Sequence, residues 1–315
     1  MHPQPVDFLD LERAFSSLLG LSVGDAFGDR FFAPVYFHSR HAHTVPEAPW
    51  AWSDDTEMAC TVTLHLAENH RVDQDLLAAE FAARLSVGRR YGANALELLE
   101  RVRAGAGWRT EARAGFGGEG SYGNGAAMRV APLGAALTGR PEEAAGTAIR
   151  TAEVTHAHPE AVQGAAAVAA AAAAAPAGMF GAVLGLLPEG RMRERVSTAS
   201  AMGDAAPERA AAVLGNGERI SALDTVPFCL WTVGRYGADY TRALRACVAV
   251  GGDMDTTAAI VGGIIAAHHG HGVIPATWLE AREPLPEWLS LRAFQPDARS
   301  AEPRDHDRAR RPPDP

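Results

Sequence analysis

The sequence has only three cysteines, Cys60, Cys229 and Cys247, among its 315 residues. A small, odd number of cysteines, each set within an apolar helical pattern, argues against the disulfide framework that stabilises many secreted domains. The pattern fits buried, reduced thiols better. We therefore expect a cytoplasmic protein.

Positive charge is also scarce. Lysine and arginine together number 29, against 38 aspartates and glutamates, which gives a formal net charge of −9. The chain therefore has no global basic field that would attract nucleic acid, and a polyanionic partner would need a local site. We do not expect nucleic acid as a partner.

The chain lacks the patterns of export and of membrane insertion. Residues 1–7 have neither the cationic start nor the apolar run of a secretory signal. Residues 161–188 carry no charged side chain and in that respect resemble a membrane span. However, alanine is only weakly apolar, and Pro176 and Gly178 divide this run. We expect two shorter helices inside a globular protein and no membrane partner.

Convincing period-two alternation, the pattern of half-buried strands, is absent, and helical periodicity recurs instead. The sequence thus predicts an almost entirely helical protein, whose length allows one large domain or two smaller ones. Residues 30–50 lose periodicity and read as a long surface loop. From residue 297 the chain is charged and nearly free of apolar residues, which predicts a disordered tail over 297–315. Helices are expected at residues 8–21, 54–66, 76–87, 95–102, 126–137, 141–153, 189–202, 207–214, 223–233, 240–250 and 258–268.

Two carboxylates and two hydroxyls crowd the turn at residues 251–257, which opens an apolar helix. Asp253 has the chemistry of an N-cap, and capping would explain one aspartate. A second aspartate, Asp255, and Thr256 beside two conformationally free glycines are more than a cap requires. Closely spaced carboxylate and hydroxyl oxygens suit a hard cation such as Mg²⁺. Capping and metal binding both remain open for this stretch alone.

A second acidic helix start repeats this chemistry at residues 52–60. Ser53 is a natural N-cap, and Asp54 and Asp55 then stand in the first helical turn, where the helix dipole favours carboxylates even without a ligand. If the two helix starts face each other, their oxygens form a cage for a cation.

A glycine-rich stretch at residues 115–125 lies between these clusters. Its backbone N–H groups could contact a phosphate, although it matches neither the P-loop nor the dinucleotide fingerprint and could equally be a flexible connection. Arg129 could pair with an acidic residue inside the protein or with a ligand phosphate, and we favour the internal pair. His156 and His158 suit a metal, a ligand hydroxyl or ordinary loop hydrogen bonds.

Five motifs together resemble the ADP-ribosylglycohydrolase family, in which they occur in the same order. The resemblance extends from about residue 18 to residue 288, and the ordered set is specific although each motif alone is weak. It implies a single, orthogonally packed all-α domain over residues 1–296 with two Mg²⁺ ions at its centre. The motifs are Gly24–Gly28 (GDAFG), Ser53–Thr56 (SDDT), Gly123–Arg129 (GNGAAMR), Thr155–Pro159 (THAHP) and Gly251–Thr257 (GGDMDTT).

The resemblance also implies roles for individual residues. Two ligand clusters would hold the ions and, through them, the hydroxyls of the distal ribose, so that water can attack the anomeric carbon. A loop and a histidine would contact the diphosphate and ribose, with Tyr122 able to stack on a ring. The metal ligands by this comparison are Ser53, Asp54, Asp55, Asp253, Asp255 and Thr256, and the substrate-binding residues are Ser121, Tyr122, Gly123, Asn124 and His156.

The family's pattern is broken at Phe32. Many relatives carry a glutamate at this position, seven residues after the aspartate of the first motif. Asp29 lies close by in the sequence and could replace it, or Asp54 or Asp55 could activate the water. The candidate catalytic residues are therefore Asp29, Asp54 and Asp55.

We thus expect a monomeric, Mg²⁺-dependent hydrolase. It would hydrolyse the glycosidic bond that links ADP-ribose to a modified arginine or serine side chain. A small ADP-ribose conjugate is the other expected substrate. The substitution at Phe32 leaves a second reading, a noncatalytic relative that binds ADP-ribose or serves a structural role.

Overall fold

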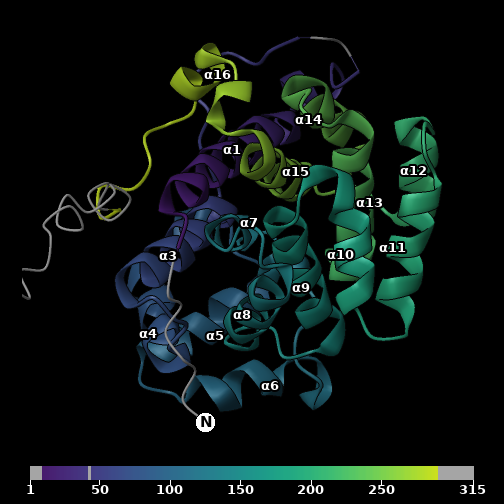
Figure 1. Cartoon of the computed structure of the whole chain (residues 1–315). Coiled ribbons are helices and arrows are strands. Elements are labelled where there is room, and N and C mark those ends of the chain that lie inside the picture. Colours follow the sequence, from purple (N-terminus) through teal and green to yellow (C-terminus); the bar gives the residue numbers. More distant parts are fainter. Residues whose placement is uncertain (1–8, 42–43, 290–315) are drawn as a thin grey trace, which may run out of the picture.

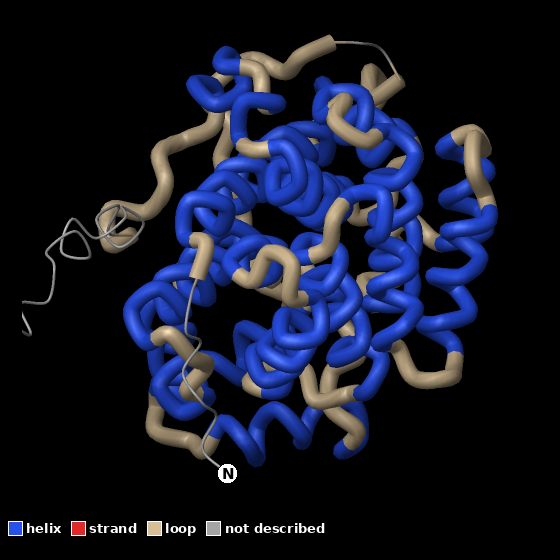
Figure 2. Tube along the Cα trace, viewed as in Figure 1, coloured by secondary structure: helices blue, strands red, loops and turns tan. Residues whose placement is uncertain are grey.

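The computed structural model describes residues 9–41 and 44–289. Within these ranges the chain forms α-helices and short 3-10 turns but no strand, which confirms the all-α expectation (Figure 2). The predicted tail at residues 297–315 lies outside the described residues, so it stays a prediction, as does the domain boundary before it. The α-helices are α1 (Leu11–Asp29), α2 (Pro34–Phe37), α3 (Asp54–Asn69), α4 (Gln74–Arg84), α5 (Ala93–Arg103), α6 (Trp108–Gly118), α7 (Ala131–Ala136), α8 (Pro141–Glu153), α9 (Pro159–Ala173), α10 (Met179–Leu186), α11 (Arg191–Ala201), α12 (Pro207–Leu214), α13 (Ala222–Tyr236), α14 (Tyr240–Ala249), α15 (Met254–His269) and α16 (Ala276–Ala281).

Most helices start where the local sequence predicts. Ser53 caps α3, with its hydroxyl accepting a hydrogen bond from the Asp55 N–H at 3.2 Å. Pro159 opens α9, because its fixed φ suits a first turn and it has no N–H to leave unpaired. The alanine-rich run is divided as expected, since α9 ends at Ala173 and α10 begins at Met179. No helix in the described ranges is long and apolar enough to cross a bilayer.

The first helix is longer than the sequence suggests. It was expected to end at residue 21 but continues to Asp29, through Gly24 and Gly28. Glycine weakens an isolated helix, so this extension depends on tertiary packing. The segment after it is also less irregular than expected, because it contains a 3-10 turn (Arg30–Phe32) and the short helix α2.

Two further predicted helix boundaries, both next to the glycine-rich stretch at residues 115–125, are wrong. Its first residues belong to α6, which bends at Gly115–Gly117, where Phe116 has a φ of 53°. The helix expected over 126–137 is replaced by a 3-10 turn (Asn124–Ala126) and the short helix α7. Left-handed backbone at Phe116 and Gly117 explains the bend in α6. Pro132 suits the first turn of α7 but not the interior of a helix, so no continuous helix spans residues 126–137.

Helices α1 and α15 pack against each other more extensively than any other pair (Figure 1). Gly20, Gly24 and Gly28 form one face of α1, spaced four residues apart. A Cβ atom placed on Gly24 would lie 2.2 Å from the Ala258 carbonyl oxygen, and one on Gly28 would lie 2.3 Å from that of Met254. The helices therefore touch backbone to backbone, and this contact brings the end of α1 beside the start of α15.

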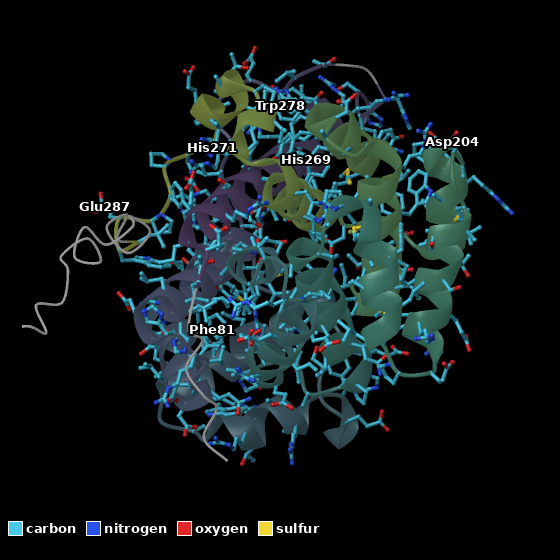
Figure 3. All side chains as sticks on the ribbon, viewed as in Figure 1. Phe81, Asp204, His269, His271, Trp278 and Glu287 are labelled. Atoms are coloured by element: carbon cyan, nitrogen blue, oxygen red, sulfur yellow. The ribbon has the colours of Figure 1, made fainter. Side chains whose placement is uncertain are left out.

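The remaining helices surround this pair. Helices α7, α9 and α13 pack against it, α4, α5 and α6 lie at the lower end in Figure 1, and α10, α11 and α12 form one side. At the upper end Trp278 of α16, labelled in Figure 3, stacks on Phe27 with ring centroids 4.3 Å apart and also meets Trp50 edge-on. This aromatic cluster anchors the last turns of α1, which carry Asp25 and Asp29.

Candidate active site

Three carboxylates from distant parts of the chain converge at the centre of the molecule. Asp25 comes from α1, Asp55 from the first turn of α3 and Asp255 from the first turn of α15. One oxygen from each lies within 4.8 Å of the others. The two acidic helix starts therefore do face each other, and a third carboxylate joins them.

Asp25 is a site residue that sequence reasoning missed. Its Oδ2 accepts hydrogen bonds from the Ser53 N–H at 2.9 Å, the Thr56 N–H at 3.1 Å and the Thr56 hydroxyl at 2.5 Å. Its Oδ1 is buried without any hydrogen-bond donor. The available signal was a lone carboxylate inside the apolar run Leu21–Phe27, where an ionised side chain is costly unless something compensates it.

Asp55, like Asp25, has one carboxylate oxygen that accepts a hydrogen bond and one that has no donor. Its Oδ2 accepts from the Ser53 hydroxyl at 3.0 Å and lies 3.4 Å from that of Thr256, while its Oδ1 is buried and without a donor. Two orphaned carboxylate oxygens in one buried cluster match the oxygen ligands that hard cations prefer. The residues present therefore fit a divalent cation.

The electrostatics of this cluster support the same interpretation. Burial, together with the charge of Asp255, raises the pKa of Asp25 to about 6. Burial also raises the pKa values of Asp54, Asp55 and Asp253 well above their usual range, with neighbouring carboxylates as the additional cause. A cation would compensate this negative charge and return the carboxylates to their ionised form.

The other predicted ligands lie around the cluster. Asp54, Asp253 and Thr256 line the adjoining cleft, whereas Ser53 is buried behind Asp55. Asp253 occupies the N-cap position of α15 but forms no capping hydrogen bond. Its Oδ2 instead accepts from the Asn124 side-chain amide at 2.7 Å. Because this carboxylate is not used to cap the helix, the capping interpretation of Asp253 is wrong.

Asp29 and Phe32 belong neither to the three-carboxylate cluster nor to the cleft lining. Asp29 forms an ion pair with the Arg90 guanidinium, whose other nitrogen is 3.8 Å from Asp255 Oδ2. Phe32 is 41% exposed and does not line the cleft. Arg90 thus connects Asp29 to the edge of the cluster, while the Phe32 ring contributes nothing to the cleft surface.

A cleft of about 490 Å³ opens from the carboxylates. Its opposite wall is the predicted substrate loop, because Ser121, Tyr122, Gly123 and Asn124 all line it together with His156. Several wall residues were not predicted, among them Phe116 and Ile220. Phe116 contacts Tyr122 with ring centroids 4.7 Å apart, and both rings are partly exposed.

The substrate loop is fixed by backbone hydrogen bonds to the segment around Ile220. The Asn124 N–H donates to the Ile220 carbonyl at 3.2 Å, and the Ala222 N–H donates to the Tyr122 carbonyl at 3.1 Å. Ile220 has a φ of 53°, which is unusual for a β-branched residue. This strained conformation forms part of a bridge that holds Asn124 within reach of Asp253.

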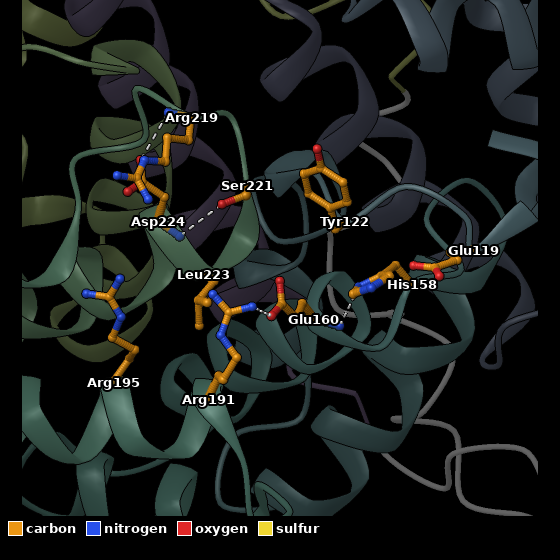
Figure 4. Close-up of a pocket in the computed structure, with 10 residues that line it drawn as sticks. All are labelled: Glu119, Tyr122, His158, Glu160, Arg191, Arg195, Arg219, Ser221, Leu223 and Asp224. Atoms are coloured by element: carbon orange, nitrogen blue, oxygen red, sulfur yellow. Dashed lines mark hydrogen bonds and ion pairs between the residues drawn. The ribbon is translucent and has the colours of Figure 1, made fainter. Parts of the chain in front are cut away.

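A second pocket of about 460 Å³ adjoins the cleft and shares Tyr122 and Arg219 with it (Figure 4). Arg191 pairs with Glu160 at 2.7 Å, and the Arg219 N–H donates to Asp224 at 3.0 Å. Arginines and carboxylates are equally represented, so charge alone does not mark this pocket for an anion. The charged lining residues other than His158 are Arg191, Arg195, Arg219, Glu119, Glu160 and Asp224.

Comparison with known proteins decides the family. The ADP-ribosylglycohydrolase family model matches residues 7–303. The chain belongs to this family. ADP-ribosylhydrolase ARH3 of Danio rerio is 26% identical over 329 residues, covering 88% of each protein. An uncharacterized protein of Archaeoglobus fulgidus is 30% identical over 299 residues, covering 85% of this chain and 91% of that protein.

A solved structure of the same family agrees with this assignment. It is an ADP-ribosylglycohydrolase-related protein complex, with a TM-score of 0.64 and 25% identity over 90% of this chain and 96% of that one. The resemblance drawn from the five motifs is therefore confirmed, as is the all-α ADP-ribosylglycohydrolase fold.

The raised carboxyl pKa values predict how stability responds to pH and Mg²⁺. Asp25 keeps its proton up to about pH 6 when folded but loses it near pH 3.8 when unfolded, so its contribution to stability falls as pH rises through this window. Bound Mg²⁺ would require ionised carboxylates and therefore stabilise more at pH 8 than at pH 5. We expect a Tm increase of about 5 °C at pH 8 with Mg²⁺ well above its dissociation constant.

Differential scanning calorimetry with Mg²⁺ or EDTA at both pH values measures this difference. An equal Mg²⁺ effect at pH 5 and pH 8 would contradict it. The Asp55→Asn variant is the control, because removing one carboxylate of the cluster should reduce both the pH dependence and the response to Mg²⁺.

Proposed function

We propose that this member of the ADP-ribosylglycohydrolase family is a Mg²⁺-dependent hydrolase. Its substrate would be ADP-ribose linked through a glycosidic bond to a protein arginine or serine, or a small ADP-ribose conjugate. The observation that carries the proposal is one cleft with two different ends. A carboxylate cluster with orphaned oxygens forms one end, and a loop with exposed aromatic rings forms the other.

The residues that would hold two Mg²⁺ ions come from three helices. Bound Mg²⁺ would supply positive charge that holds ribose hydroxyls and favours deprotonation of the attacking water. Asp25 contributes its free Oδ1 to the set expected from the sequence. The complete proposed set is Asp25, Ser53, Asp54, Asp55, Asp253, Asp255 and Thr256.

The other end of the cleft suits the rest of ADP-ribose. A volume of about 490 Å³ is within the range of small-molecule sites. The exposed faces of Tyr122 and Phe116 offer a surface for a planar base. Ser121, Gly123, Asn124 and His156 would then contact the diphosphate and the ribose between the base and the carboxylates.

Hydrolysis joins a water oxygen to the anomeric carbon as the bond from that carbon to the side-chain nitrogen or oxygen breaks. The leaving side chain gains a proton, and the water loses one. Asp54 and Asp55 both line the cleft, so either carboxylate can accept the water's proton and stabilise oxocarbenium character. We favour these two over Asp29, because Asp29 is engaged by Arg90.

Release of ADP-ribose tests the activity. We expect Mg²⁺-dependent turnover of at least one of three substrates, namely ADP-ribosylated arginine, ADP-ribosylated serine and O-acetyl-ADP-ribose. The Asp253→Ala/Asp255→Ala double variant should lose it, since the carboxylates of α15 are removed together. Calorimetric binding of ADP-ribose without turnover of any substrate would instead support a noncatalytic binding protein, the alternative that Phe32 motivates.

The buried cysteines and the positions of the proposed ligands bear on the compartment and the oligomeric state. The three free cysteines are buried, which suits a reducing compartment, and we propose the cytoplasm. We also propose that the chain acts as a monomer, because the ligands from α1, α3 and α15 all lie within one chain.

A further inference from the structure

Arg129 is fully buried without a carboxylate partner. It lies between the substrate loop and α7, and the expected internal pair with an acidic residue is wrong, since no described carboxylate forms an ion pair with it. Its guanidinium lies over the ring of Phe81, 4.6 Å from the centroid, at the interior position labelled in Figure 3. Its Nη2 donates to the Thr151 carbonyl at 2.8 Å and to the Thr155 hydroxyl oxygen at 2.9 Å.

These contacts determine which hydrogen bond the Thr155 hydroxyl accepts and which it donates. A guanidinium has only donors, so Thr155 Oγ1 must accept from Arg129. The same oxygen lies 2.7 Å from His156 Nδ1, and the hydroxyl proton has no other acceptor among the described residues. An unused hydroxyl proton in a buried site is costly, so Thr155 donates to Nδ1. His156 Nδ1 is then an acceptor, and the proton of the neutral ring sits on Nε2.

That proton faces the substrate loop. A Cβ atom on Gly125 would lie 3.0 Å from His156 Nε2, and one on Gly123 would lie 3.3 Å from it. Glycine at both positions therefore leaves this edge of the ring open toward the cleft that His156 lines. Burial lowers the pKa of His156 to about 3, and the positive charge of Arg129 acts in the same direction, so the ring stays neutral at physiological pH.

We propose that Arg129 and Thr155 are positioning residues that lock His156 in the Nε2–H tautomer and make it a permanent hydrogen-bond donor to an oxygen of the ligand. Identifying that ligand as ADP-ribose rests on the proposed function, whereas the tautomer does not. This arrangement assigns His156 neither a metal nor a proton-transfer role, because Nε2 carries a proton and Nδ1 is occupied by Thr155.

Imidazole ¹⁵N NMR of the histidine-labelled full chain tests the tautomer, with the His156→Ala variant identifying the resonances. We expect an Nε2–H tautomer in the wild type and in Thr155→Ser, which keeps the hydroxyl. Thr155→Val should lose the single tautomer. Thr151→Val is the matched control, because Thr151 is an equally buried threonine whose hydroxyl, among the described residues, donates to the Ala148 carbonyl of its own helix.

Calorimetry with ADP-ribose is the second measurement. Thr155→Val should weaken binding on the order of tenfold, while Thr155→Ser and Thr151→Val stay within about threefold of the wild type. An Nδ1–H tautomer in the wild type, or a Thr155→Val variant that matches Thr151→Val in both measurements, would overturn the proposal. Failure of the wild type to bind ADP-ribose would instead refute the proposed function, and the NMR spectrum would still decide the tautomer.

Discussion

Replacing Asp25 with asparagine should lower turnover of ADP-ribosylated substrate by about 10³-fold and remove the stabilisation by Mg²⁺. The amide can reproduce the contacts of Oδ2 with Ser53 and Thr56, but it places neutral N–H donors where the orphaned Oδ1 now points. Those donors would repel a cation. We therefore expect the folded structure to persist while the proposed metal site loses its function.

The same substitution should have the opposite effect on stability without metal. In EDTA at pH 8, Asp25→Asn removes a buried negative charge from a cluster of like charges, so its Tm should exceed that of the wild type. Steady-state kinetics and thermal unfolding together measure both effects. Asp204→Asn is the matched control, because Asp204 is an exposed carboxylate at the edge of the molecule in Figure 3 and does not line the cleft. An Asp25→Asn enzyme with a tenth or more of wild-type turnover would contradict the assignment.

Replacing Gly24 with alanine should destabilise the protein by about 3 kcal/mol and lower its Tm by roughly 6 °C or more. The new Cβ would lie 2.2 Å from the Ala258 carbonyl oxygen and 2.7 Å from its carbon. Both atoms are backbone, so only separation of α1 from α15 relieves the clash. Because Asp25 and Asp255 sit on these helices, affinity for Mg²⁺ should fall as well.

Gly146→Ala provides the comparison for this variant. Gly146 lies within α8, and a Cβ atom there meets nothing within 4 Å. Since alanine favours a helix over glycine by about 1 kcal/mol, this variant should be as stable as the wild type or more so. Thermal unfolding in EDTA measures the loss of stability, and titration with Mg²⁺ measures the loss of metal affinity. Equal Tm values for Gly24→Ala and Gly146→Ala would refute close packing of α1 on α15.

The sequence revealed those parts of the site that depend on local chemistry. The acidic starts of α3 and α15 were visible because a hydroxyl and paired carboxylates stand before an apolar helix at Ser53–Asp55 and Asp253–Thr257. Their order with the other motifs also identified the family. These features depend on residues a few positions apart, which a single sequence displays directly.

The residues that were missed depend on contacts between distant segments. Asp25 becomes a site residue only because glycines of α1 allow the α15 backbone to approach. The partners of Arg129 are a carbonyl oxygen and a hydroxyl of the segment Thr151–Thr155, so charge matching pointed to the wrong kind of partner. The length of α1 was also underestimated, since glycine has low helix propensity and the stabilising contact lies far along the chain.

The pairing of α1 with α15 has a consequence for synthesis of the protein. The hydroxyl of Ser17 bonds to the carbonyl of Gly263, 246 residues away, and the helices touch along their length. On the ribosome α1 therefore emerges long before α15 has been translated. Contacts of such high sequence separation form slowly. A prematurely terminated chain lacking α15 would have no Asp255 and no complete carboxylate cluster, so the proposed activity can arise only after α15 has been made.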